Sequence, residues 1–268
     1  MAKTKRKRKN GGKAKGGATS LPAAARRVPV KVDLGDWDRS RLEAMLEAGE
    51  RIRTCLRVLA KTEGNVVGEL LRGQGTFYEW DHYPNGDVYD RDTHAQYYYH
   101  AHPAELRGGE HGHFHTFLRP KGMPAGVRPA PLEDYRPPDD PDDALSHLVA
   151  VSMDRAGKPI RLFTTNRWVT GEVWYTADDV IRLLDRFEID HAWPSWPTNI
   201  WIGAMLVLFR PQVEALLRLR DETVAAWTPD DPEISVFEDR ALEITSVMDI
   251  SVDKQIREVE RALQAQAA

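Results

Sequence analysis

The stretch of sequence that decides the fold is residues 97–118, YYYHAHPAELRGGEHGHFHTFL. Within and beside it, residues 96–102 and 111–118 are rich in aromatic side chains, as β-strands are, and a loop containing Gly108 and Gly109 separates them. The two segments are therefore expected to pair as a hairpin. Because successive side chains of a strand point to opposite faces, the histidines within each segment should share one face.

The pairing register of this hairpin determines whether its two groups of histidines meet. If His102 lies opposite His111, all five histidines occupy one face, and Tyr99 meets Phe114 on the other. A shift by one residue would mix the polar and aromatic sets, which a sheet with one buried face resists. We therefore expect the first register. The five histidines are His100, His102, His111, His113 and His115.

Five imidazoles on one face predict a metal site. Neighbouring histidines lower each other's pKa, so most of these rings should be neutral at pH 7. Neutral imidazoles are good ligands for zinc, iron, manganese or copper. The alternative is a polar, solvated face, or histidines that hydrogen-bond to the neighbouring tyrosines.

Four residues are candidates for roles in catalysis. Glu110 is a candidate ligand or general base, although strand alternation would point it to the opposite face, and His113 is a candidate catalytic residue. Tyr98, on the histidine face, and Arg167 are candidates for binding a substrate. The guanidinium of Arg167 suits a carboxylate or phosphate of a substrate, and the alternative is that it pairs with a surface carboxylate such as Glu172.

Outside the hairpin, the chain reads as helices, then strands, then helices. Apolar residues recur every three or four positions across residues 39–60, and further helices are expected to begin near residues 66, 177, 199, 211 and 252. Strands at 147–153 and 159–164, with the aromatic segment 77–82 beside a turn at 84–87, bring the sheet to about five strands. We expect an α+β fold, with an antiparallel sheet and helices packed on one face.

Charge is unevenly distributed along the chain. Residues 1–27 carry ten Lys or Arg and no acidic residue, so with the whole chain at −4 the remainder carries −14. We expect a disordered tail, residues 1–30, that contacts nucleic-acid phosphates or, alternatively, only aids solubility. A single α+β domain is expected at residues 31–268, with residues 119–143, rich in proline and aspartate, as a long surface loop.

Composition excludes several other classes of protein. One cysteine, Cys55, allows neither an intramolecular disulfide nor a cysteine metal cluster. No secretory signal is visible, and the longest apolar run, residues 200–209, is about half of a membrane span. We therefore expect a cytoplasmic protein that does not enter a membrane.

The segment His111-Gly112-His113-Phe114-His115-Thr116-Phe117-Leu118 resembles the motif of the histidine-triad nucleotide hydrolases and transferases. The resemblance implies that His113 attacks an α-phosphate while His111 and His115 bind and protonate phosphate oxygens. Gly112 and Thr116 depart from the family pattern, which has bulky apolar residues there. The segment also follows a strand, whereas the family motif follows a helix.

A longer resemblance covers roughly residues 40–228 and is to an uncharacterised bacterial family known only as a domain of unknown function. It is carried by residues 97–102 and 110–117, by Thr165-Asn166-Arg167-Trp168-Val169-Thr170-Gly171-Glu172, and by Trp193-Pro194-Ser195-Trp196-Pro197-Thr198-Asn199. This resemblance implies no activity.

Three functions therefore stay open. The first is a metal-binding protein or a metalloenzyme. As an enzyme it would be a metal-dependent hydrolase or oxygenase that acts on a small molecule through activated water. The second is metal-free nucleotide chemistry at His113. The third is a non-enzymatic binding module whose basic tail contacts nucleic acid.

Overall fold

The predicted hairpin lies within a sheet of seven strands in the computed structural model, which describes residues 26–27, 32–103 and 107–267. The strand order is β1-β7-β6-β5-β4-β3-β2. Neighbours from β2 to β7 are antiparallel, and only the two-residue β1 pairs in parallel, with β7. The strands are β1 Arg26–Arg27, β2 Tyr83–Tyr89, β3 Ala95–His100, β4 Gly112–Leu118, β5 Ser146–Met153, β6 Pro159–Thr165 and β7 Ile244–Asp249.

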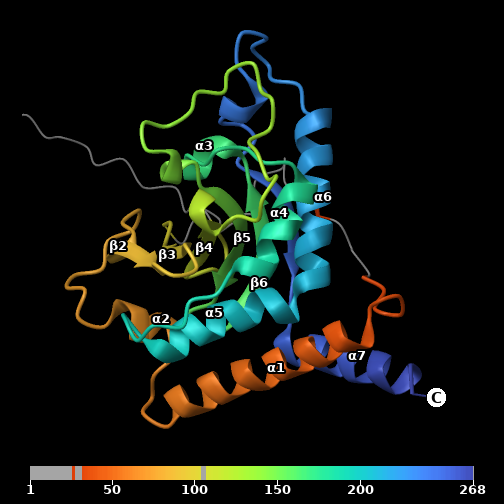
Figure 1. Cartoon of the computed structure of the whole chain (residues 1–268). Coiled ribbons are helices and arrows are strands. Elements are labelled where there is room, and N and C mark those ends of the chain that lie inside the picture. The colour runs from red at the N-terminus through yellow and green to blue at the C-terminus, as the bar shows by residue number, and fades with distance from the viewer. Residues whose placement is uncertain (1–25, 28–31, 104–106, 268) are drawn as a thin grey trace, which may run out of the picture.

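The helices pack in two layers on one face of the sheet. Figure 1 shows α4, α5 and α6 against the strands, with α1 and α7 beyond α5. The helices are α1 Arg39–Ala60, α2 Val66–Leu71, α3 Arg167–Thr170, α4 Ala177–Leu183, α5 Trp196–Leu208, α6 Arg210–Ala226 and α7 Val252–Ala265. Short 3-10 turns lie at Pro120–Gly122, Pro141–Asp143, Leu184–Arg186 and Val236–Glu238. The predicted α+β class, with helices on one face of an antiparallel sheet, is confirmed.

Local capping explains where several helices begin. The side chains of Thr176 and Ser251 accept hydrogen bonds from backbone N–H groups in the first turns of α4 and α7, which begin where the sequence predicts them. Helix α5 begins at Trp196, earlier than the predicted start near residue 199, because Pro197 fits its first turn. The Thr198 hydroxyl therefore lies inside α5 and donates to the carbonyl of Val66.

Two strands differ from the sequence prediction. The turn-like residues 84–87 lie inside β2, where the register with β3 shifts between Tyr83 and Val88. Gly86 and Asp87 both have positive φ there, so these residues form a bulge within a strand and not a hairpin turn. Strand β7 was not expected from sequence, and it pairs with β6 at the opposite side of the sheet from the hairpin.

The helix-facing side of the sheet forms the main hydrophobic core. Phe114 of β4 contacts the ring of Trp201 on α5, and the Tyr97 hydroxyl of β3 donates to Asn199 Oδ1, 2.6 Å away. A smaller apolar cluster lies on the other side of the sheet, with Ala150, Phe163, Ile244 and Val247. The central strands are therefore buried on both faces, even where the face opposite the helices carries polar side chains.

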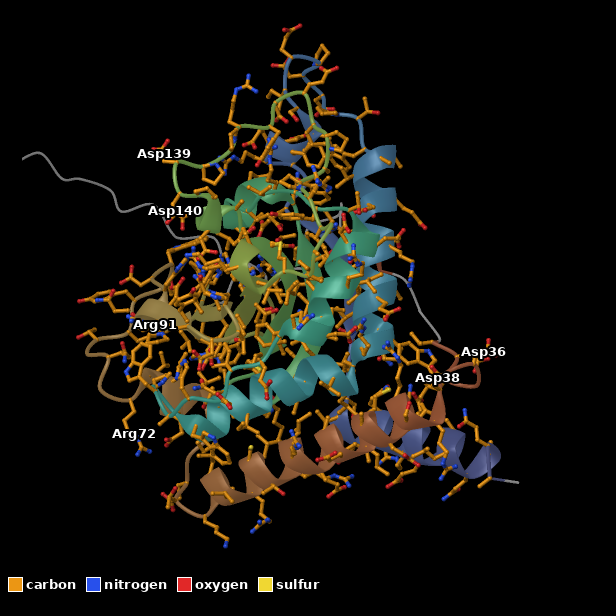
Figure 2. All side chains as sticks on the ribbon, in the orientation of Figure 1. Asp36, Asp38, Arg72, Arg91, Asp139 and Asp140 are labelled. Carbon is orange, nitrogen blue, oxygen red and sulfur yellow. The ribbon has the colours of Figure 1, made fainter. Side chains whose placement is uncertain are left out.

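The segment predicted as a surface loop is mostly irregular and exposed. Asp139 and Asp140 project outward from it, as do Arg72 and Arg91 elsewhere at the edge of the molecule (Figure 2). Among the described residues, none of the helices alone has the length and hydropathy to cross a bilayer. Helices α5 and α6 meet those criteria only when taken together, with a bend of 72° between them.

Candidate metal centre

The register of β3 and β4 is the one that separates polar from aromatic residues. Tyr98 pairs with His115, Tyr99 with Phe114, and His100 with His113, as predicted. Tyr99 and Phe114 face the helices, whereas His100, His113 and His115 lie on the opposite side of the sheet. The cross-strand row that contains His100 and His113 continues through Ser152 of β5 and Arg161 of β6. One row therefore brings histidine, serine and arginine side chains to the same face.

Three of the five histidines bring their ring nitrogens together. His100, His102 and His113 each offer one nitrogen, and these atoms lie within 4.8 Å of one another. The His100 ring centroid lies 4.5 Å from that of His113 and 4.9 Å from that of His102. His113 is 1 % exposed and His100 is 8 % exposed, while His102 is less buried. The arrangement has the number and type of ligands of a three-histidine metal site.

Glu110 points into this face and orients His113. Its Oε1 accepts a hydrogen bond from His113 Nδ1 at 2.6 Å, and its Oε2 accepts one from the Ser152 hydroxyl at 2.6 Å. A neutral His113 that donates through Nδ1 carries its lone pair on Nε2, the nitrogen then free to bind an ion. A carboxylate behind a histidine ligand is the usual outer partner in metal sites. Both carboxylate oxygens are thus engaged, which suits a positioning residue better than the predicted general base.

Glu110 escapes the expected alternation because it precedes the strand. Strand β4 begins at Gly112, so the loop before it sets the direction of Glu110. The N–H of Glu110 donates to the carbonyl of Arg107, which closes a turn there. Its side chain is buried beneath the histidines.

His111 does not join the histidine face, contrary to the prediction. Its Nδ1 is hydrogen-bonded to the Tyr99 hydroxyl at 2.6 Å, and its ring stacks on Phe77 and Tyr99. His111 also precedes the first ladder residue of β4, so strand alternation does not apply to it. A Cβ at Gly112 would lie 2.5 Å from both the His100 carbonyl oxygen and the Tyr99 hydroxyl, so β3 and β4 approach closely here only because this residue is glycine.

His115 connects the three converging histidines to a further one, His147 of β5. His115 Nδ1 and His147 Nε2 share a hydrogen bond of 3.0 Å, and His147 Nδ1 lies 3.5 Å from the Thr165 hydroxyl. The His115 ring lies 4.7 Å from that of His113. His115 is therefore adjacent to the three-histidine group rather than one of its three converging ligands.

Burial keeps these histidines neutral. Desolvation, followed by nearby positive groups, lowers the pKa of His102 and of His147 to about 3. The same causes hold the pKa values of His100 and His115 well below their usual range. Burial alone would raise the pKa of Glu110, but His113 and the two hydrogen bonds outweigh it and lower that pKa to about 2. The face combines neutral imidazoles with an ionised carboxylate.

Several buried nitrogens on this face have no hydrogen-bond partner. Eight such side-chain atoms occur among the described residues, and four of them belong to this neighbourhood. The four are His100 Nε2, His115 Nε2, Arg107 Nη1 and Arg161 Nη1. Buried polar groups in proteins are nearly always paired, so this concentration makes the face a candidate binding site.

Aromatic residues border the cluster on the side of β2. The Tyr98 ring stacks on His82, with centroids 3.6 Å apart, and lies 5.1 Å from the His115 ring. Trp80 packs edge-on against His102, is 57 % exposed and has a φ of 74°. The predicted substrate contact Tyr98 is therefore next to the cluster. Its role stays a prediction.

Arg167 lies elsewhere. On α3, its guanidinium pairs with Asp134 and Glu238 and stacks over the ring of Phe237. Arg167 therefore pairs with surface carboxylates, as the alternative interpretation expected, although with Asp134 and Glu238 and not with Glu172. The Glu172 carboxylate accepts the backbone N–H of His147 instead. Arg167 is not among the residues that the structure brings to the histidines.

Sequence reasoning missed four residues of the site. His147 and Ser152 reach it from β5, Arg161 reaches it from β6, and Arg107 reaches it from the hairpin loop. His147 is an isolated histidine in an apolar strand, and only the pairing of β4 with β5 reveals its position. Of the upstream histidines, His82 borders the cluster, whereas His94 hydrogen-bonds to the Tyr89 hydroxyl.

Fold and site together define an α+β protein that carries a buried histidine cluster on the sheet face opposite its helices. The chain belongs to the family described as Domain of unknown function (DUF6969), which matches residues 46–250. No curated protein and no solved structure matches the chain.

Proposed function

We propose that this protein binds a zinc, iron or manganese ion through His100, His102 and His113. The observation that carries the proposal is the convergence of three imidazole nitrogens within 4.8 Å, one of them oriented by a buried carboxylate. Metal–nitrogen bonds of about 2.1 Å place tetrahedral ligands about 3.4 Å apart, so the rings need to approach by about 1 Å to hold an ion.

The donor set favours a catalytic ion over a structural one. Structural zinc sites are closed by four protein ligands, whereas three histidines leave a position open. An ion bound there would supply Lewis acidity at the open position, the basis of metal-dependent hydrolase and oxygenase chemistry. Glu110 would hold His113 in the ligating tautomer, and Ser152 would hold Glu110. We infer a small-molecule substrate, approaching along the side bordered by Trp80 and Tyr98.

The first test is the metal content of the wild-type protein, purified without an affinity tag and measured by elemental mass spectrometry. We expect close to one equivalent of zinc, iron or manganese, and uptake of one equivalent on reconstitution after chelation. His102→Ala should lose this binding, and because His102 is the least buried ligand its loss should least disturb folding. Wild-type protein that neither holds nor takes up metal would refute the proposal.

The matched control is His94→Asn. His94 lies between β2 and β3, bonds to Tyr89 and has a φ of 61°, a conformation that asparagine tolerates. This variant should bind metal as the wild type does. Equal loss in His94→Asn and His102→Ala would point to general unfolding, and equal retention would remove His102 from the ligand set.

No contact favours the histidine-triad alternative. That chemistry needs His111, His113 and His115 around one phosphate, but His111 stacks on Phe77 and Tyr99. Most of the basic tail lies outside the described part of the chain, apart from Arg26–Arg27, which pair with β7 as strand β1. Contact of the tail with nucleic acid stays a prediction, as does the cytoplasmic location, which cell fractionation would test.

A further inference from the structure

The four unpartnered nitrogens of the site are of two chemical kinds. His100 Nε2 and His115 Nε2 belong to imidazoles, which can bind a metal ion or hydrogen-bond either way. Arg107 Nη1 and Arg161 Nη1 belong to guanidiniums, which only donate hydrogen bonds and never bind a cation. A metal ion alone would therefore leave the two arginine donors without partners.

Contacts with other residues hold Arg107 in place but leave its Nη1 without a hydrogen-bond partner. Its Nη2 donates to Glu243, and its guanidinium lies over the Phe163 ring, 5.5 Å from the centroid. The Phe163 ring also packs against the ring of His113 in an edge-to-face arrangement, with centroids 5.0 Å apart. The side chain of Arg107 is 5 % exposed, so its free Nη1 cannot turn to bulk water. A buried, unsatisfied donor on a charged group is costly, which favours an acceptor at this position.

Arg161 lies near Glu110, on the same face of the sheet as the histidines. It occupies the cross-strand row of His113 and Ser152, and its Nε donates to Asp249 at 3.0 Å. Its Nη1 lies 3.9 Å from Glu110 Oε2, an ion-pair distance that is too long for a hydrogen bond. Both guanidiniums are therefore held by carboxylates, and each keeps one buried Nη1 without a hydrogen-bond partner.

The buried charges of the site also favour a bound anion. The side chains of Arg107 and Arg161 are only 5 % and 13 % exposed. Of the three carboxylates near them, Glu110 alone is buried, since Glu243 is 27 % exposed and Asp249 is 67 % exposed. A buried charge is stable only when paired, so a negative group beside these two guanidiniums is favoured.

We propose that Arg107, with Arg161, binds an oxyanion of the substrate, a carboxylate or a phosphate, beside the three-histidine centre. This inference rests on the proposed metal function and names the substrate class for it. Guanidinium groups suit both anions because their donors match carboxylate and phosphate oxygens. The substrate is then an acid or a phosphate ester whose charged oxygen lies next to the reacting position.

The test measures anion binding to the cobalt-substituted full-length protein by visible absorption, since cobalt in a zinc-type site reports changes at its open position. Inorganic phosphate and acetate are the two probes, and the tighter one identifies the class of oxyanion. We expect Arg107→Gln to weaken the preferred anion at least tenfold while retaining one cobalt per chain.

Arg167→Gln is the matched comparison. Arg167 also pairs with carboxylates and also lies over a phenylalanine ring, 5.1 Å from the Phe237 centroid. It should leave anion binding unchanged. Equal affinities in wild type and Arg107→Gln would overturn the inference, and so would a loss confined to Arg167→Gln. If Arg107→Gln does not fold, Arg161→Gln takes its place, with the same expected loss and the same overturning result.

Failure of the metal proposal would look different. A protein that takes up no cobalt refutes the metal centre, and phosphate and acetate are then titrated into metal-free protein by calorimetry. Binding that disappears in Arg107→Gln would preserve the anion site on its own. No binding of either anion to the wild type would refute it as well.

Discussion

The two faces of the β3–β4 hairpin are equally buried and yet differ in what satisfies them. On the helix side, Phe114 packs against Tyr99 and Trp201, and the Tyr97 hydroxyl has its acceptor in Asn199. On the other side, neighbouring positions place His113 and His115 in a cluster with unpartnered nitrogens. Trp201 Nε1 is an unpartnered atom on the helix side, but it is isolated. Burial alone therefore does not distinguish the two faces, whereas the concentration of unsatisfied polar atoms on one of them does.

The largest effect on stability should come from the helix-facing side. Phe114→Ala removes a fully buried ring and should lower the free energy of unfolding by about 3–5 kcal/mol. Urea unfolding, monitored by tryptophan fluorescence, measures this change. Ile234→Ala, at an exposed position, should have an effect near zero. A small effect of Phe114→Ala would mean that this face is not the main core.

His113, the residue next to Phe114, should affect metal affinity, whereas Phe114 should affect stability. His113→Ala should abolish tight metal binding, an affinity loss of at least about 100-fold, because one of three ligands is gone. Metal titration against a competing chelator measures the affinity. Retention of wild-type stoichiometry and affinity would exclude His113 as a ligand and weaken the contrast between the two faces.

The carboxylate behind His113 should have a smaller effect on the same quantity. Glu110→Gln keeps an acceptor near His113 Nδ1 but removes its charge, so metal affinity should fall about 10- to 100-fold. Glu79→Gln, at an exposed position, is the control and should bind metal normally. If Glu110 were only a structural residue, Glu110→Gln would change stability and leave affinity intact.

His147 should make the wild type lose stability more steeply than His147→Gln as the pH falls below 7. Its pKa is about 3 in the folded protein, mainly through burial, against about 6.5 when unfolded. Below pH 6.5 only the unfolded chain binds this proton, so the free energy of unfolding falls by about 1.4 kcal/mol per pH unit until about pH 3. Between pH 7 and 5, metal-free wild type should lose about 2 kcal/mol more than His147→Gln. Parallel pH profiles would contradict a neutral, buried His147.

The smallest effect should come from His111, the histidine of the hairpin that lies outside the cluster. His111→Ala removes the hydrogen bond to Tyr99 and should cost about 1 kcal/mol of stability, with metal stoichiometry unchanged. Urea unfolding and elemental mass spectrometry check the two quantities. Loss of metal in this variant would mean that His111 belongs to the metal site, which contradicts its placement outside the histidine cluster.

Much of the fold could be predicted because local patterns agreed with tertiary packing. The bounds of α1 follow from its apolar periodicity, and the start of α2 follows from its cap at Asn65. The hairpin register follows from the separation of histidine from aromatic positions. Strand β7 could not be recognised, because six residues after an irregular segment carry little pattern of their own. Residues 84–87 have a turn composition, and only their pairing with β3 makes them a bulge.

The site was less predictable because it depends on residues at strand ends and on strand pairing. Alternation places His100 and His113 correctly, but it fails for Glu110 and His111, which precede the ladder. His147 and Arg161 enter through β5 and β6, whose registers the sequence does not specify. Sequence thus indicates that histidines gather here, while tertiary pairing decides which of them converge.

The close approach at Gly112 has a consequence for recognising this site in other chains. The three histidines, Glu110 and Gly112 all fall within residues 100–113, in the order His-x-His, seven residues, then Glu-x-Gly-His. A family member can therefore be sorted by this short signature, without a structure. Members that keep the histidines but carry a larger residue at the glycine position would have β3 and β4 spread apart, and they should form a separate branch that lacks the centre.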